Sequence, residues 1–250
     1  MTLVRALGEK LGDDVHLGAS AISMQRGRTN GKFQFELRVA HQGRTELLKA
    51  SAVVVATGTE AAGQLLSGIS EHFVAQFTKI EYAPVAVVAG GYRREQVVHP
   101  VDGFGFLVPR REGMRVLGTV WNSSLFPGRA PQGMVNLTSF AGGATDPDLL
   151  QSTDSEVGDT IAQEVARVLK IIGQPATTRV QRYARALPQY NLGHGTTIAT
   201  LRELCAISPG VFLTGNYLEG PSIGVCVEQA FHAAQAVQRY LASTGDLGQC

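Results

Sequence analysis

The feature that most constrains this chain is an apolar run near its C-terminus that leads through a glycine-containing loop into a long helical pattern. The run spans residues 211–216, the loop reaches residues 221–222, and apolar periodicity continues over 223–241. A short apolar run bounded in this way is typical of a buried strand in an α/β sheet. A second run, 52–58, leads into a helical pattern at 61–66 and predicts another strand, buried on both faces. The two strands are expected to share a sheet.

The loop after residue 213 is also the strongest candidate for a binding site. Free backbone N–H groups at the start of a helix attract negative charge, and the helix dipole adds to that attraction. Gly215 and Gly224 have no side chains, so a flat or anionic ligand could approach the backbone closely. Pro221 suits the first helical turn. The spacing alone fits a ligand site and an ordinary strand–helix connection equally well.

The rest of the chain alternates between strand and helix signals. A helix at 2–11 precedes a predicted three-stranded meander at 15–22, 33–39 and 45–49. The middle of the chain predicts four strands, at 82–88, 103–108, 115–120 and 135–140. The later segments predict a strand at 177–183 and a helix at 197–204. We therefore predict an α/β fold with α+β character, divided into parts at 1–77, 78–175 and 176–250.

A capping box, Thr153-Asp154-Ser155-Glu156, marks the start of a further helix. Gly173 is expected to end this helix. Its predicted apolar stripe consists of Val157, Ile161, Val165, Val168 and Ile172.

Composition excludes several classes of protein. The 22 basic and 21 acidic side chains give a formal net charge of +1 without a basic cluster, which argues against nucleic-acid binding. Three cysteines without CxxC spacing and six histidines without ligand spacing support neither a disulfide scaffold nor a metal site. The N-terminus lacks the apolar core of a signal peptide, and no apolar run approaches the roughly 20 residues that span a bilayer. These features predict a cytoplasmic protein. GxGxxG and P-loop motifs are absent.

Four segments together resemble one enzyme family. Residues 103–131 begin Gly-Phe-Gly-Phe-Leu-Val-Pro and end Phe-Pro-Gly-Arg-Ala-Pro, and residues 186–194 read Ala-Leu-Pro-Gln-Tyr-Asn-Leu-Gly-His. The other two segments are residues 53–58 and 215–228. The order and spacing of the four segments along the chain match those of the family. This pattern resembles the oxygen-dependent, FAD-containing protoporphyrinogen oxidases of the flavin amine oxidase superfamily. The resemblance covers almost the whole chain. It implies part of a Rossmann-like FAD-binding domain together with a β-rich substrate domain.

The resemblance also implies that a GxGxxG segment and a largely helical, membrane-associated region would precede residue 1. The chain is therefore expected to be a C-terminal portion, inactive alone, that binds FAD weakly or not at all. Peripheral membrane contact through the preceding region and a homodimer both stay open.

The resemblance implies roles for particular residues. Those expected at the FAD are Ala21 at the adenine, Thr57 and Gly58 at the phosphate–ribose arm, Gly215 and Asn216 at the pyrophosphate, Ile223, Gly224 and Val225 beneath the isoalloxazine, and Tyr183 near the flavin. Leu107 and Phe126 are expected to contact the tetrapyrrole substrate. Without the resemblance, core packing would be the better explanation for those two residues. No acid–base residue and no metal are implied, because the flavin takes a hydride and O₂ reoxidises it.

Three alternatives stay open. Coproporphyrinogen could replace protoporphyrinogen as the substrate. The chain could belong to an amine oxidase, although those enzymes place an aromatic residue where Val225 stands, and the Phe126–Pro131 stretch favours porphyrinogens. A non-catalytic, truncated remnant is the third reading, and the missing GxGxxG supports it.

Overall fold

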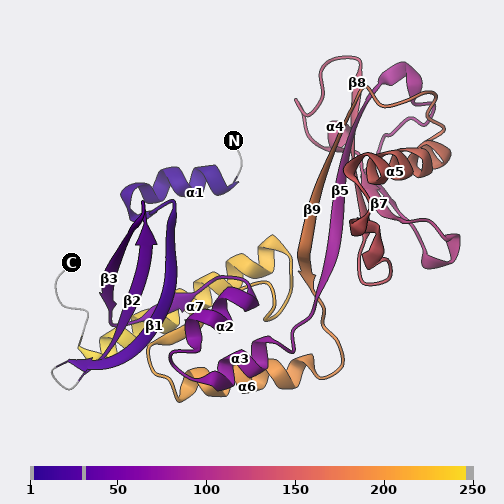
Figure 1. Ribbon diagram of the computed structural model, residues 1–250. Coiled ribbons are helices and arrows are strands. Elements are labelled where there is room, and N and C mark those ends of the chain that lie inside the picture. The colour runs from indigo at the N-terminus through magenta and orange to yellow at the C-terminus, as the bar shows by residue number, and fades with distance from the viewer. Residues whose placement is uncertain (1–2, 30–31, 246–250) are drawn as a thin grey trace. The chain divides into compact units, whose positions relative to one another are not determined.

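The strand and helix signals of the sequence correspond to a mixed α and β structure. The computed structural model describes residues 3–29 and 32–245 (Figure 1). Its strands are β1 (Ala19–Thr29), β2 (Lys32–His41), β3 (Arg44–Ala50), β4 (Val53–Val55), β5 (Tyr82–Arg93), β6 (Gly105–Leu107), β7 (Val116–Val120), β8 (Met134–Gly142), β9 (Thr177–Pro188) and β10 (Val211–Leu213). Its α-helices are α1 (Leu3–Leu11), α2 (Thr59–Leu66), α3 (Glu71–Phe77), α4 (Asn122–Leu125), α5 (Asp154–Leu169), α6 (His194–Ala206) and α7 (Ile223–Thr244).

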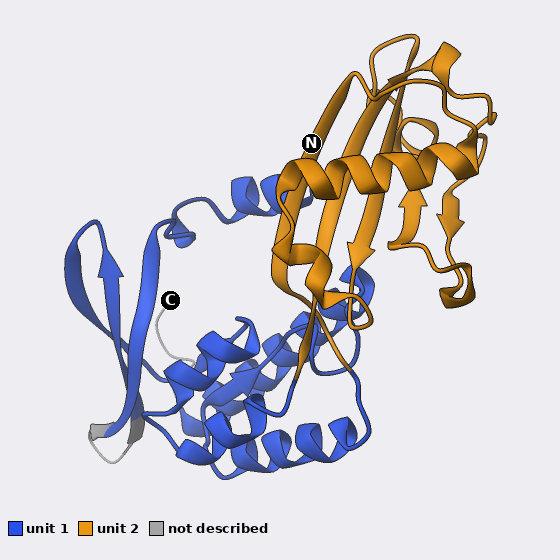
Figure 2. Ribbon diagram, turned by 45° about the vertical axis from the view of Figure 1, so that its right-hand side comes forward, with its two compact units in different colours: residues 1–80, 190–250 blue, residues 81–189 orange. Residues whose placement is uncertain are grey.

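The chain divides into two compact units (Figure 2). Unit 1 comprises residues 1–80 and 190–250, and unit 2 comprises residues 81–189. The sequence placed the second boundary at residue 175. However, β9 pairs with β5 along most of its length, so residues 177–188 belong to the sheet of unit 2. That boundary was wrong because a strand belongs with its hydrogen-bonded neighbour, and sequence position does not reveal which neighbour that is.

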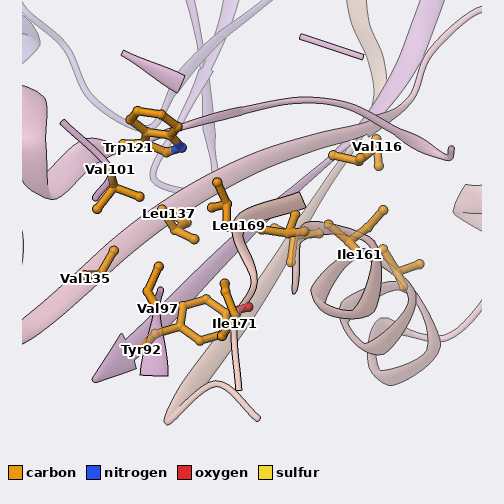
Figure 3. Packing of buried hydrophobic residues seen from close by; sticks show 14 of the residues in the cluster. Tyr92, Val97, Val101, Val116, Trp121, Val135, Leu137, Ile161, Leu169 and Ile171 are labelled. Carbon is orange, nitrogen blue, oxygen red and sulfur yellow. The ribbon is translucent and has the colours of Figure 1, made fainter. Parts of the chain in front are cut away.

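Unit 2 is a five-stranded sheet in the order β6-β7-β8-β5-β9, with every pairing antiparallel. Figure 2 shows α5 lying across one face of this sheet. Helix and sheet enclose one hydrophobic cluster, seen from close by in Figure 3, which includes Leu137 of β8, Ile161 of α5 and Trp121. The cluster explains why α5 forms where it does, since its apolar stripe needs a sheet face to cover.

The capping box of α5 is confirmed, because the Thr153 side chain accepts from the backbone N–H of Glu156 and the Glu156 carboxylate accepts from that of Thr153. The predicted end of the helix was wrong. Lys170, three residues before Gly173, adopts a left-handed conformation with φ 51° and closes the helix at Leu169. Leu169 takes the buried position, and Val168 and Ile172 are exposed.

Unit 1 contains two small sheets. β1, β2 and β3 form the predicted antiparallel meander, and β4 and β10 pair in parallel, which confirms that the two apolar runs share a sheet. The first meander strand was predicted to begin at Val15. It begins instead at Ala19, because Gly18 adopts a positive φ and interrupts the earlier alternation.

The two apolar runs form shorter strands than predicted. β4 comprises only Val53–Val55, and the middle residue, Val54, is 43% exposed, so this strand is not buried on both faces. β10 covers only Val211–Leu213. The apolar composition of each run was correct for a strand, but among the described residues each of these strands has one partner. Burial on both faces requires a larger sheet covered on both sides.

No helix within the described ranges is both long and apolar enough to cross a bilayer.

Candidate functional site

Two loops of unit 1 meet at one edge of the parallel pair β4–β10. Thr214 follows β10, and its backbone N–H donates to the Val55 carbonyl of β4 at 3.1 Å, so the carboxyl ends of both strands lie together. Thr57 and Gly58, after β4, are exposed. Ligands of open α/β sheets bind outside the carboxyl ends of parallel strands. The structure therefore brings Thr57 and Gly58 to the same edge as the loop that begins at Gly215.

The loop after β10 is held by a buried aromatic side chain. Tyr217 is fully buried and packs edge-to-face against Phe77, with 5.7 Å between ring centroids. A Cβ on Gly215 would lie 2.7 Å from the Tyr217 ring, so only glycine fits there. The Asn216 carbonyl accepts a hydrogen bond from the Tyr190 hydroxyl. Gly215 and Asn216 thus present a fixed backbone at this edge.

The N-terminus of α7 follows this loop directly. Ser222 caps the helix by accepting from the backbone N–H of Val225 at 3.2 Å. The first main-chain bond within the helix runs from Cys226 to the Ser222 carbonyl, which leaves the N–H groups of Ile223 and Gly224 in the first turn ahead of it. A Cβ on Gly224 would meet nothing closer than the Ser222 oxygen at 4.0 Å. The first turn can therefore receive a flat group or an anion at its backbone.

The last two predicted cofactor residues lie elsewhere. Ala21 is exposed in the separate three-stranded sheet, where the β1–β2 register shifts between Ala21 and Ser23. Tyr183 lies on β9 in unit 2 and is 50% exposed. The structure thus gathers Thr57, Gly58 and the 215–225 segment, while the flavin contacts of Ala21 and Tyr183 stay predictions.

Both predicted substrate residues belong to unit 2 and are solvent-exposed. Leu107 of β6 is 87% exposed, and Phe126, just after α4, is 52% exposed. Core packing, the better explanation on sequence grounds alone, is therefore wrong for both side chains. A large apolar side chain held in water by a regular strand suggests a contact surface.

Phe140, which was not predicted from the sequence as a site residue, shares the exposed sheet surface with Leu107. Leu107 pairs with Gly118, and Gly118 pairs with Phe140 of β8, so the three residues form one row across neighbouring strands. Phe140 is 37% exposed. Its position in the alternation of β8, opposite the buried Leu137 and Ser139, is the sequence signal that could have found it.

The segment that carries Phe126 is tied to β8. The side-chain amide of Asn122 donates to the Thr138 hydroxyl, and the amide of Asn136 donates to the Arg129 carbonyl at 3.1 Å. The Arg129 guanidinium lies 5.8 Å from the centroid of the Phe126 ring. These contacts place an aromatic ring and a cation beside the strand that carries Phe140.

A separate cavity of about 260 Å³ lies between α6, β10 and α7. None of the predicted site residues lines it. Burial raises the pKa of the Cys205 thiol at its wall to about 11, so this thiol stays protonated at neutral pH. The cavity is therefore not the predicted site, and Cys205 is not poised as a nucleophile.

Comparisons with known proteins identify the class. The profile of the flavin containing amine oxidoreductase family matches residues 2–238. This chain belongs to that family, which confirms the predicted flavoprotein family and FAD as its cofactor.

Among individual relatives, the chain is 29% identical over 98% of its length to "Protoporphyrinogen oxidase 1, chloroplastic" of Spinacia oleracea, covering 45% of that protein. It is 30% identical over 78% of its length to "Coproporphyrinogen III oxidase" of Bacillus subtilis (strain 168), covering 42% of that protein. A solved structure of a protein from Exiguobacterium sp. 255-15 superposes with a TM-score of 0.74 and 21% identity, over 96% of this chain and 51% of that one. The chain thus spans about half the length of these relatives.

The strand-end edge of unit 1 fits part of an FAD site. Gly58 is exposed, and a Cβ placed on it would meet no atom within 4 Å. With the N–H groups at the start of α7, this edge offers backbone donors and room for a phosphate or a flat ring. Thr57, Gly58, Gly215, Asn216 and the first turn of α7 are the residues that would hold their share of the cofactor.

Proposed function

We propose that this chain forms the C-terminal part of an FAD-dependent enzyme that oxidises a porphyrinogen to a porphyrin, with protoporphyrinogen IX as the substrate in haem biosynthesis. The observation that carries the proposal is the exposed apolar row of unit 2, in which Leu107 and Phe140 lie on one sheet surface, close to the segment of Phe126. A flat, largely apolar tetrapyrrole is the kind of ligand that such a surface suits. The names of the relatives support the same substrate class.

Each unit would contribute a different part of the reaction. FAD, when bound, accepts a hydride from the substrate, and O₂ is the expected final oxidant. The N–H groups of Ile223 and Gly224 would stabilise negative charge beside the first turn of α7. The apolar row of unit 2 would orient the macrocycle and exclude water from one of its faces. No acid or base from this chain is required, because the protein's role is to position the reactants.

The immediate test is binding of protoporphyrin IX, the stable product, to the purified 250-residue chain. Saturable binding that weakens about tenfold in Leu107→Asp, because a carboxylate replaces an apolar contact, would support the proposal. Glu112→Gln, a charge change on the exposed turn after β6, is the matched control and should leave binding unchanged. Porphyrin binding that is unchanged in Leu107→Asp would contradict the role proposed for the apolar row. Competition by benzylamine at equal affinity would favour an amine substrate instead.

A second candidate is a non-catalytic chain, which the exposed Val54 favours, because among the described residues the parallel pair β4–β10 has no further strand. In either case we expect the chain alone to bind FAD weakly or not at all. The check is absorbance near 450 nm after purification. Stoichiometric flavin would contradict this expectation and would count against the non-catalytic candidate.

A further inference from the structure

The two sides of β9 differ in what they face. A Cβ on Gly158 of α5 would lie 3.1 Å from the Thr178 methyl carbon and 3.7 Å from a Val180 methyl carbon, so Thr178 and Val180 point toward α5. Successive side chains of a strand point to opposite faces. Arg179 and Gln181 therefore point to the face of the sheet that α5 does not cover. We call this the open face.

The open face carries one continuous row across all five strands. Leu107 pairs with Gly118, Gly118 with Phe140, Phe140 with Val87, and Val87 with Gln181. The row is apolar from β6 to β5 and ends on a polar residue at β9. Gly118 has no side chain, and the Leu107 side chain fills its place, with Cδ2 2.8 Å from where a Cβ would stand. The open face is therefore an apolar platform with a polar rim along β9.

Arg179 lies on this rim, two residues along β9 from Gln181. It pairs with Ala89 of β5, and Ala89 pairs with Thr138 of β8. Two residues along a strand span about 7 Å, so the Arg179 backbone stands at about that distance from Gln181. A guanidinium at the end of so long a side chain can reach the edge of a ligand that rests on Val87 and Phe140.

Two arginines of β9 differ in their ionic partners. Arg182, on the α5 side of the strand, donates to the Asp154 carboxylate at 2.7 Å and to the Leu150 carbonyl at 2.6 Å. Arg179 is exposed and, within the residues that the structure describes, has no carboxylate within 4.0 Å. The Arg182 guanidinium is thus held by α5 and its preceding turn, whereas the Arg179 guanidinium is left for solvent or a ligand.

We infer that Arg179 binds a propionate carboxylate of the tetrapyrrole and so fixes which edge of the macrocycle lies over β9. The inference rests on the proposed function, because it takes a porphyrinogen as the occupant of the open face. The chemistry is complementary, since the macrocycle matches the apolar row and its acid side chains need a cation beside it. A guanidinium can hold a carboxylate through two parallel hydrogen bonds, which fixes orientation as well as affinity.

The test compares protoporphyrin IX with its dimethyl ester, which has the same macrocycle without the charges. Binding of each to the 250-residue chain is followed by porphyrin absorbance in the wild type, Arg179→Gln and Arg179→Lys. We expect Arg179→Gln to weaken binding of the acid about tenfold and binding of the ester less than about twofold, because only the acid loses a charged partner. Arg179→Lys, which keeps the charge but loses the fork, should give an intermediate value.

Arg167→Gln provides the matched control, because it removes the same charge from an exposed position on α5, the helix that covers the other face. It should change neither affinity. Equal weakening of acid and ester in Arg179→Gln, or an acid affinity that does not change, would overturn the inference while leaving the proposed function standing. Failure of the wild type to bind either porphyrin would overturn the proposed function, and this inference with it.

Discussion

Units 1 and 2 bury their apolar surfaces in different ways. In unit 2, one helix covers one face of a five-stranded sheet, and 16 buried residues form a single cluster. Unit 1 also buries large side chains such as Tyr217, yet α7 leaves Ile223, Val227 and Phe231 exposed at successive turns of one stripe. Val54 of its parallel pair is exposed as well. Unit 2 therefore has a self-contained core, whereas unit 1 keeps apolar surface available for contacts outside the described fold.

The largest expected effect is the difference in free energy of unfolding between a substitution of a buried apolar residue and one of an exposed apolar residue. Leu137→Ala, in the core of unit 2, should lower the free energy of unfolding by about 3 kcal/mol, because it removes buried methyl groups and leaves a cavity. Phe231→Ala, on the exposed stripe of α7, should change it by less than about 0.5 kcal/mol. Urea unfolding followed by the fluorescence of Trp121, the single tryptophan, reports on unit 2, and circular dichroism reports on both units. Equal losses would show that the outer face of α7 is covered in solution.

The next effect concerns a charge that anchors α5 to its sheet. The Glu164 carboxylate is buried and accepts the backbone N–H groups of Arg115 at 3.1 Å and Val116 at 2.8 Å. Glu164→Ala should cost about 2 kcal/mol, because both donors lose their partner. Gln163→Ala, at an exposed position of the same helix, is the control and should be nearly neutral. A loss of unfolding free energy no larger than that of the control would mean that water accepts the hydrogen bonds of the two backbone N–H groups in the variant.

A smaller effect is expected at the start of α7. Ser222→Ala removes the cap that accepts from Val225 and should destabilise unit 1 by about 1 kcal/mol. Ser222→Asp should restore the loss, since aspartate caps helices equally well. The transition seen by circular dichroism should move while the Trp121 transition of unit 2 stays in place. If both transitions moved together, the two units would unfold as one, which would contradict a self-contained core in unit 2.

The smallest effect is a pH dependence at α5. Hydrogen bonds from the Thr153 backbone N–H and then from its hydroxyl lower the pKa of the Glu156 carboxyl below its usual value. A lowered pKa in the folded state gives stability that is present above the unfolded pKa, about 4.3, and is lost as pH falls through the folded value. Glu156→Gln should therefore reduce the decline in melting temperature between pH 5 and pH 3. Glu203→Gln, exposed on α6, should not.

Local signals predicted those parts of the structure that depend on neighbours in sequence. The capping box at Thr153 and Glu156 needs only four consecutive residues, and the meander needs only alternation and two turns. Errors arose where a distant partner decides the outcome. The end of α5 is one example, because the bridge between Ile171 and Val97 takes residues after Lys170 into an extended conformation.

In the candidate site, too, some features depend on neighbours in sequence and others on distant partners. The glycine loop at Gly215 and the start of α7 were predictable, because the strand, the glycine loop and the helix follow one another along the chain. The resemblance supplied Leu107, but its exposure depends on which face of the sheet α5 covers. Phe140 and Arg179 were missed because alternation along a strand separates two faces without saying which one a helix will bury.

The sequence by itself determined the order of the strands and of most helices, the capped start of α5, the start of α7, and the family to which the chain belongs, because these rest on local propensity and motif spacing. The tertiary structure alone decided that β9 joins β5 in unit 2 and that Leu107, Phe140 and Arg179 share the open face. Hydrogen-bond pairing and helix packing act between residues far apart in the chain, so the pattern of any one segment does not specify them.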